Sequence, residues 1–315
     1  MVKLGLGQSY NKVIIPKKIR AYVDITKPAS SFGVMFTIPF AAIIYGDITH
    51  GNGVEFLLQE WTDVLYASIT TLLLHGSSQA LNMAEDAYID KQTDHKQNRP
   101  IPSGVISEEE ARSLAWVFMF LGIARAFITS TQFGLFAITL AFLGVFYNLD
   151  PIRAKKHLWL NLVWQAVSRG LLIFPAAFSI WGAGDHLVPW VMGVLGFMLV
   201  LSLQNSADLP DMEMDEEYGI ITPAVYHGPK TLILIMGAIS AIMFCSLTLF
   251  IRMDLIPNFW SLYILVIPIA GSLLKLWLDP TGTSDLSGQS SVWYAYYFSL
   301  ASLYMLPAMQ LTLLQ

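Results

Sequence analysis

Charged residues are scarce in this chain of 315 residues. They make up 13% of it, against roughly 25% in soluble domains. Hydrophobic residues make up 55%, which is more apolar surface than a soluble core of this length can hide. The single cysteine, Cys245, lies in an apolar run, so a disulfide framework and a cysteine-based zinc site are excluded. The polar, basic start has no short apolar stretch before a small-residue cleavage site, so we expect the first apolar run to be a retained helix.

Long apolar runs are what the chain has instead. Each is near the ~20 residues that cross a bilayer, so we expect an all-α, polytopic membrane protein with about nine transmembrane helices. The expected spans are 30–47, 62–84, 108–128, 131–148, 159–180, 187–205, 230–252, 258–276 and 291–313. No linker is long enough to separate soluble domains. We therefore expect one transmembrane domain over 1–315, with 1–28 as a basic N-terminal segment.

Lysine and arginine are distributed unevenly between the two sides of these spans. They gather in segment 1–28 and in the loops after the second and fourth spans. This asymmetry predicts a cytoplasmic N-terminus, with the loops after spans 2, 4, 6 and 8 on the same side.

Segment 8–24 mixes basic and apolar residues. Two interpretations stay open for it: an interfacial helix on an anionic leaflet, or a disordered tail that only enforces topology.

Three side chains with oxygen ligands lie at the end of the second expected span: Asn82, Asp86 and Asp90. They are spaced by four residues and therefore form a column on one helical face. The sixth span ends in a second acidic segment, with spacing i, i+3, i+7: Asp208, Asp211 and Asp215. Pro210 removes a backbone donor there and is expected to perturb the helix. Carboxylates stacked this closely repel one another unless a hard divalent cation lies among them.

A solvated acidic helix end is the simpler interpretation of either segment alone. Two facts weigh against it: both segments fall on the same predicted side, and each continues a polar face that begins inside an apolar span, where polar groups are costly. Mg²⁺ typically uses one or two carboxylates plus phosphate oxygens, so a diphosphate is the natural ligand. Four basic residues on that side could neutralise its remaining charge: Lys96, Arg99, Arg153 and Lys155. For Lys156 we expect only the general positive-inside bias.

Several segments, taken in order from residue 25 to about 228, resemble the UbiA superfamily of intramembrane prenyltransferases. The Asn82-x3-Asp86-x3-Asp90 segment, followed by R-P-I-P-S-G over 99–104, is similar to that family's N-D-x-x-D-x-x-x-D and R-P-[IL]-P-S-G. The segment Asp208-x2-Asp211-x3-Asp215, with Gly219 and Thr222, resembles its second acidic motif. The stretch 147–155 resembles Y-S-x-P-P-x-R-x-K, and 25–28 resembles L-x-R-P. The chain departs from these motifs at Met83, Asp94, Lys27, Asn148 and Asp150.

The resemblance implies a Mg²⁺-dependent enzyme of isoprenoid and lipid biosynthesis. It would transfer a prenyl group from a polyprenyl diphosphate to a lipophilic acceptor, in a cavity that opens sideways to membrane lipid. It implies metal binding by Asn82, Asp86, Asp90, Asp208, Asp211 and Asp215. It implies catalytic roles for Asp86, Asp90, Asp211, Asp215 and Tyr147. It also implies diphosphate binding by Lys96, Arg99, Arg153 and Lys155. No nucleic-acid partner is expected.

Other functions stay open at this point. The same motifs would serve an intramembrane terpene cyclase, in which the substrate's own chain attacks the allylic cation. A divalent cation transporter would need acidic residues through the membrane, and a purely structural protein leaves the 99–104 segment without a role. Arg169 falls near the middle of the fifth span. It either borders the active cavity or pairs with Gln165 or His75.

Overall fold

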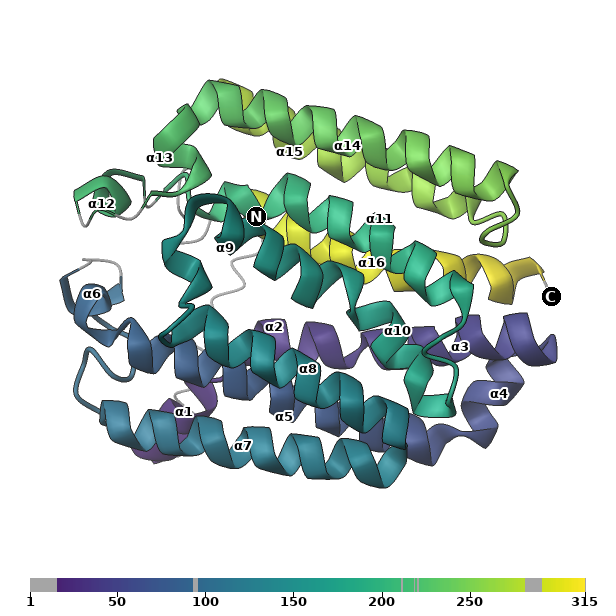
Figure 1. Cartoon of the computed structure of the whole chain (residues 1–315), viewed down its shortest axis with the longest axis horizontal. Helices are drawn as coiled ribbons and strands as arrows, with labels where there is room; N and C mark the ends of the chain where they lie inside the picture. Colours follow the sequence, from purple (N-terminus) through teal and green to yellow (C-terminus); the bar gives the residue numbers. More distant parts are fainter. Residues whose placement is uncertain are drawn as a thin grey trace.

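The computed structural model describes residues 16–92, 96–210, 212–217, 219, 221–280 and 291–314. Every regular element within these ranges is a helix. The long helices lie side by side with their axes nearly parallel (Figure 1). They are α3 (Thr37–His50), α5 (Trp61–Glu85), α7 (Glu108–Thr129), α8 (Thr131–Asn148), α11 (Leu187–Leu203), α14 (Pro229–Arg252), α15 (Val266–Leu278) and α16 (Ser291–Leu314).

Seven helical runs in the described ranges are long and apolar enough to cross a membrane. They cover Glu108–Thr129, Thr131–Asn148, Leu158–Trp181, Leu187–Ala207, Pro229–Arg252, Trp260–Leu278 and Val292–Leu314. These agree with seven of the expected spans. The expected span 62–84 also forms one continuous helix, α5, but α5 buries polar side chains along its inner face, including Ser68, Thr70, Ser77 and Gln79.

A single helix over 30–47 was the wrong expectation. The chain forms α2 (Pro28–Met35) and then α3, with a break at Phe36. Pro39 explains the break, because it has no N–H to donate to the carbonyl one turn earlier, at Met35. The Thr37 hydroxyl instead donates to the Val34 carbonyl at 2.6 Å.

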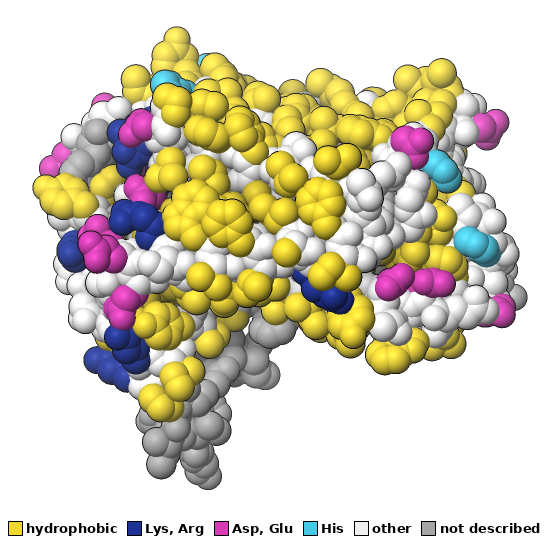
Figure 2. Space-filling model, turned by 60° about the horizontal axis from the view of Figure 1, so that its bottom comes forward, with side chains coloured by type: hydrophobic (Ala, Val, Ile, Leu, Met, Phe, Trp, Pro, Cys, Tyr) yellow, Lys and Arg dark blue, Asp and Glu magenta, His cyan; other side chains and the backbone are white. Residues whose placement is uncertain are grey.

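Both acidic segments lie at the same end of the bundle. In Figure 1 this is the left end, where α6 (Ala87–Gln92) and α12 (Met212–Glu217) face each other, with α13 (Pro223–His227) and α1 (Lys17–Asp24) close by. The opposite end carries α4 (Gly53–Gln59). Figure 2 shows a broad band of hydrophobic side chains between two charged ends, with most of the visible Lys and Arg at one of them. A bilayer would cover this band.

The fifth span crosses α11 at very close range. It is built from α9 (Leu158–Ala166), a π-helical turn (Val167–Leu171), α10 (Ile173–Phe178) and the 3-10 turn Ser179–Trp181. A Cβ added at Gly170 would lie 2.5 Å from the Gly196 carbonyl carbon. Small residues permit this backbone contact, as they do at many crossings of membrane helices.

We therefore expect Gly170→Ala to destabilise the bundle by about 1–3 kcal/mol, because the atoms that must move are backbone. Gly237→Ala is the matched control, since its Cβ would meet only Leu273 at an ordinary 3.8 Å. Thermal unfolding in detergent compares the two variants. Equal melting temperatures for both would contradict the close crossing.

The N-terminal helix α1 lies against the start of α7. Its side chains Ile19 and Val23 are 54% and 50% exposed, on a helix that also carries Lys17, Lys18 and Arg20. Helical structure over 17–24 favours the interfacial-helix interpretation for that part of segment 8–24. Residues 8–15 lie outside the described ranges.

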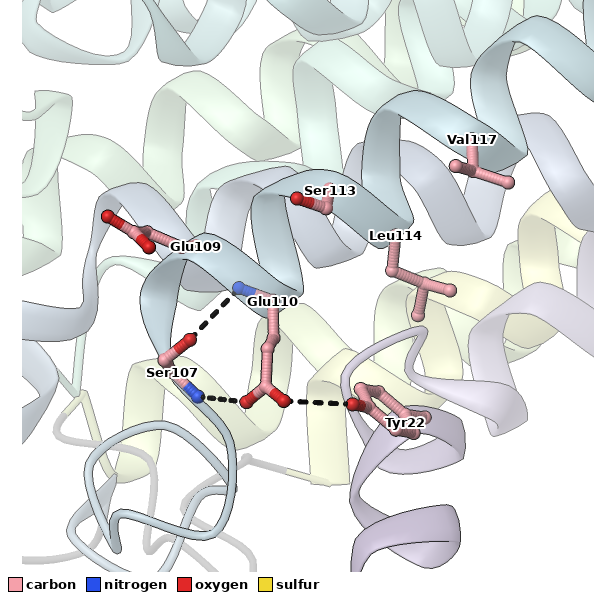
Figure 3. A pocket seen from close by; sticks show the side chains of 7 residues that line it. All are labelled: Tyr22, Ser107, Glu109, Glu110, Ser113, Leu114 and Val117. Carbon is pink, nitrogen blue, oxygen red and sulfur yellow. Dashed lines mark hydrogen bonds between the residues drawn. The ribbon is translucent and has the colours of Figure 1, made fainter.

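An open groove of about 450 Å³ separates α1 from α7 (Figure 3). Its floor is a capping box in which Ser107 and Glu110 exchange hydrogen bonds, and Tyr22 donates its hydroxyl to Glu110 Oε1 at 3.2 Å. Lys18 also binds that carboxylate at 2.5 Å, and this hydrogen bond and charge raise the pKa of Lys18. These contacts fix α1 beside the acidic end.

Candidate active site

The first acidic segment keeps its three side chains on one face although the helix label changes within it. α5 ends at Glu85, Asp86 is its C-cap, and α6 follows. The backbone ladder continues, because Asp86 N donates to Asn82 O at 3.0 Å and Asp90 N donates to Asp86 O at 2.9 Å. The Asn82 amide also donates to Asp86 Oδ2 at 3.0 Å. The predicted column therefore forms.

Two cations from other segments hold these carboxylates. Lys155 Nζ donates to Asp86 Oδ1 at 2.5 Å, and Arg99 Nη1 donates to Asp90 Oδ2 at 2.7 Å. The Lys155 side chain is 12% exposed and that of Asp90 4%. These ion pairs bring together four of the predicted site residues. They also place two cations directly beside the acidic column.

Asn148 joins these groups and was not predicted to be part of the site. Its Oδ1 accepts from Asn82 at 2.9 Å and from Lys155 at 3.3 Å, while its own amide donates to the Gly144 carbonyl. It is buried at the end of α8. The sequence signal was its place directly after Tyr147, where it had counted only as a departure from the family pattern.

The 99–104 segment holds Arg99 in place through its backbone. Ser103 N donates to Arg99 O at 3.0 Å, and Val105 N donates to Pro100 O at 3.0 Å. Ile101 is buried, and Gly104 takes a positive φ of 73° that closes the turn. The proline, isoleucine and glycine of this motif thus position the arginine that binds Asp90.

The second acidic segment does not form one continuous helix, in agreement with the perturbation predicted at Pro210. α11 passes into a 3-10 turn (Gln204–Ala207), and α12 begins only at Met212. Pro210 lies in this break and cannot donate a backbone hydrogen bond. Asp208 and Asp215 are each half-buried on either side of the break. Asp211 lies outside the described residues, as does Asp94.

Tyr147 lies within electrostatic range of both acidic segments. The carboxylates of Asp208, Asp86 and Asp215 all act electrostatically on its hydroxyl, although they come from segments far apart in the sequence. That hydroxyl donates to Asn161 Oδ1 at 3.0 Å and accepts from Gln165 Nε2 at 3.1 Å. The sequence left Gln165 open as a structural partner of Arg169; in the structure its amide donates to the Tyr147 hydroxyl.

A cavity of about 460 Å³ begins at this point and runs into the bundle. Near the acidic end its walls are polar and include Lys27, His75, Gln79, Tyr147, Gln165 and Arg169. Farther in, the walls are apolar and include Met119, Phe133, Ala137, Leu140, Ile173 and Leu300. Burial, together with the positive charges of Arg99 and Arg169, lowers the pKa of Lys27 to about 8. The cavity thus matches an amphiphilic ligand with its polar group toward the acidic end.

The other predicted basic residues lie at the same end of the bundle. Arg153 is half-buried, with a left-handed φ of 40°, and its buried Nε has no hydrogen-bond partner in the described part of the chain. Lys96 is half-buried, at the start of the loop that carries Arg99. Lys156 is exposed, and the expectation that it contributes only to the charge bias stays a prediction.

A family profile decides between the classes of membrane protein that this geometry allows. The profile of the UbiA prenyltransferase family matches residues 55–299, which covers both acidic segments and all the helices between them. The chain belongs to the UbiA prenyltransferase family. The predicted resemblance is confirmed, and the protein is a polytopic membrane enzyme that transfers prenyl groups.

Relatives and solved structures agree with this assignment. The digeranylgeranylglyceryl phosphate synthase of Methanococcus aeolicus is 25% identical over 291 residues, covering 91% of this chain and 96% of the relative. The protoheme IX farnesyltransferase of Archaeoglobus fulgidus is 26% identical over 133 residues, covering 42% of each chain. A UbiA homolog from Archaeoglobus fulgidus, bound to DMAPP and Mg²⁺, shares the fold with a TM-score of 0.66 at 16% identity. That match covers 93% of this chain and 99% of the homolog.

The donor atoms of this prenyltransferase fit a magnesium ion. Carboxylate and carboxamide oxygens from the two segments are the hard ligands that Mg²⁺ prefers. Within the described ranges, no three acidic or histidine side chains are close enough to hold a metal by themselves. Mg²⁺ usually completes its shell with water and substrate phosphates, so this arrangement suits an ion that binds together with a diphosphate.

Proposed function

We propose that the protein carries out Mg²⁺-dependent transfer of a prenyl group from a polyprenyl diphosphate to a lipophilic acceptor within the membrane. The observation that carries the proposal is the convergence on Tyr147. Carboxylates from both acidic segments act electrostatically on its hydroxyl, Lys155 binds one of them, Asp86, and the hydroxyl lines a largely apolar cavity. A diphosphate with a long apolar tail fits both halves of this site.

Three groups of residues would have separate roles in this reaction. Asn82, Asp86, Asp90, Asp208, Asp211 and Asp215 would hold Mg²⁺, which neutralises charge on the leaving diphosphate. Lys155 and Arg99 sit beside Asp86 and Asp90 and would bind diphosphate oxygens directly, with Lys96 and Arg153 nearby. The Tyr147 hydroxyl, fixed by Asn161 and Gln165, would orient the bond that breaks.

The cavity beyond Tyr147 supplies dry surroundings for the reaction. Its inner walls are apolar, so water that would capture an allylic cation is excluded. Two of its lining residues, Gly33 on α2 and Tyr294 on α16, are exposed at the outer surface of the bundle. A lipophilic acceptor would enter from membrane lipid beside these helices.

A cation transporter fits the same features poorly. Asp90 is the only fully buried carboxylate among the described residues, and it lies at one end of the bundle. A transporter would need acidic side chains along the path through the membrane. A terpene cyclase stays the second candidate, because it uses the same diphosphate chemistry without an acceptor.

The deciding experiment incubates the purified protein with Mg²⁺, prenyl diphosphates of several lengths and a membrane lipid extract, with products identified by mass spectrometry. We expect a prenylated lipid that forms only when Mg²⁺ and extract are both present. A cyclic hydrocarbon formed without extract would favour the cyclase. Intact donor under all conditions would refute the proposal.

We propose further that the acidic end, the N-terminal segment 1–28 and both Asp-rich loops face the cytoplasm, on one domain spanning 1–315. The gathering of Lys and Arg at that end supports this orientation (Figure 2). In a Cys245→Ala background, Gln92→Cys and Glu213→Cys are both exposed and should react with an impermeant thiol reagent from the same side of sealed vesicles. Asp185→Cys, on the opposite loop, should react from the other side. Labelling of positions 92 and 213 from different sides would refute the arrangement.

A further inference from the structure

The cavity extends much farther from the acidic end than a diphosphate needs. Tyr147 and Phe133 both line it, and they lie fourteen residues apart on α8. At a rise of 1.5 Å per residue, this separation is about 21 Å along the helix. On α16 the lining residues run from Trp293 to Tyr304, which is about 16 Å in the same direction. The cavity is therefore a long slot that follows the axis of the bundle.

The end of the slot that lies far from the acidic segments is lined by buried, mostly small or apolar residues. They are Phe133, Ala137, Ala176, Ala177, Leu300 and Tyr304. The exposed lining residues lie elsewhere: Gly33 is on α2, and Tyr294 is in the first turn of α16. A hydrocarbon chain that passes these two positions enters surroundings that are closed to lipid.

Hydrogen bonds fasten the floor of the slot. Ser130, the N-cap of α8, lies three residues before Phe133 and donates its hydroxyl to the Ser179 carbonyl at 2.6 Å. Beside it, the Gly184 amide donates to Gln132 Oε1 at 3.1 Å. These bonds join the start of α8 to the end of the fifth span, so the slot ends at Phe133.

An aromatic pair fixes a second wall at this end. The Phe174 and Tyr304 rings stack with their centroids 3.8 Å apart and an angle of 5° between their planes, and each residue is 1% exposed. The pair joins the fifth span to α16 about one turn before Ala177. Rings packed at this density do not move aside without cost, so the length of the slot is fixed.

The tail of the prenyl donor is the ligand that fits this slot. A diphosphate held at the acidic end leaves its first carbon near Tyr147, and the attached chain must run away from the charged groups. An isoprene unit adds four chain bonds, and an extended chain advances roughly 1.1–1.2 Å per bond, so each unit needs about 4.5 Å. A length of about 21 Å therefore holds four units, and a fifth would meet Phe133.

We propose that the buried end of the slot limits the donor to a tail of about four isoprene units, with Phe133 as the floor. This inference rests on the proposed prenyl transfer and specifies its donor. Ala137 lies one turn above Phe133 on the same face of α8, and its small side chain leaves space for the last unit. The slot excludes longer tails and does not attract shorter ones strongly, because a tail that leaves lipid gains little from other apolar surroundings.

The test supplies the purified protein with Mg²⁺, the membrane lipid extract, and donors of two, three, four, six and nine isoprene units. We expect kcat/KM for the donors of two to four units to agree within about tenfold. The donors of six and nine units should be at least about tenfold poorer than the donor of four, because they overfill the slot.

Two substitutions should move this limit in opposite directions. Ala137→Phe fills the slot about 15 Å from Tyr147, so the four-unit donor should lose about tenfold in kcat/KM while the three-unit donor is unaffected. Phe133→Ala removes the floor, so the six-unit donor should gain about tenfold. A gain of this kind cannot come from misfolding.

Matched controls lie on the same helix. Ile138→Phe adds a ring at a position that is 46% exposed, and Phe136→Ala removes a ring that contacts Trp190 and does not line the cavity. Both should keep the wild-type dependence on donor length. Melting temperatures in detergent check each variant, and Ala177→Leu replaces Ala137→Phe if the latter melts early.

Equal use of the four-unit and nine-unit donors would overturn the inference while leaving prenyl transfer intact, because it would show that the tail leaves through the opening to lipid. A change in the chain length of the prenylated lipids in Ala137→Phe, with the donor dependence unchanged, would also overturn it and assign the slot to the acceptor. Failure of the proposed function would look different, since no donor of any length would be consumed.

Discussion

Replacing Asp86 with alanine is expected to lower kcat for prenyl transfer by about 10²–10³-fold, because charge on the leaving diphosphate loses part of its compensation. Asp86 is the residue on which the first segment converges, since Asn82 and Lys155 both bind its carboxylate. The measurement is steady-state product formation at saturating Mg²⁺ and donor.

Two further variants separate this effect from a folding defect. Asp86→Asn keeps the shape and can still accept from Lys155, so it should melt like wild type and be nearly as inactive as Asp86→Ala. Glu216→Ala removes an exposed acid of α12 and should keep most activity. Activity of Asp86→Asn within a few-fold of wild type would show that the carboxylate is not a ligand.

Lys155→Met is expected to raise KM for the donor about tenfold to a hundredfold, because one charge-assisted hydrogen bond to the diphosphate is lost. Methionine preserves the length and apolar stem of the side chain. Asp86 then loses its cation, so the variant should also require more Mg²⁺ for half-maximal activity. A titration of donor and then of Mg²⁺ measures both effects.

The neighbouring residue gives the control for this variant. Lys156→Met removes the same charge from the same 3-10 turn, Ala154–Lys156, but Lys156 is exposed. It should behave like wild type. If both lysines raised KM equally, the effect would come from general surface charge and not from the contact between Lys155 and Asp86.

The fold was predictable wherever one physical rule dominated. Apolar length alone placed α8 and α14 within a residue of their observed ends, because a membrane helix must satisfy its backbone internally. Proline overrode this rule at two places. Pro39 divided the first expected span, and Pro210 separated Asp208 from α12. Pro210 itself predicted a perturbation of the helix. The periodicity of the sequence could not show that the next helix, α12, would begin at Met212.

The sequence predicted the two groups of residues that form the site. It did not predict the hydrogen bonds and ion pairs that connect them. Spacing by four placed Asn82, Asp86 and Asp90 on one face, which the backbone ladder confirms. Which cation would bind which carboxylate depends on loops that fold back over many residues, so no local pattern encodes it. Asn148 joins Asn82 to Lys155 for the same reason, across separations of 66 and 7 residues.

The central claim is that the two acidic segments serve a single diphosphate site, and a double-mutant cycle tests it most directly. Asp86→Asn and Asp215→Asn are made singly and together, and kcat/KM for the donor is measured at saturating Mg²⁺. Residues that act as one unit are strongly non-additive, so the double mutant should be about as slow as the slower single mutant. A double mutant that falls by the full product of the two single effects would contradict the account, because it would mean two independent sites.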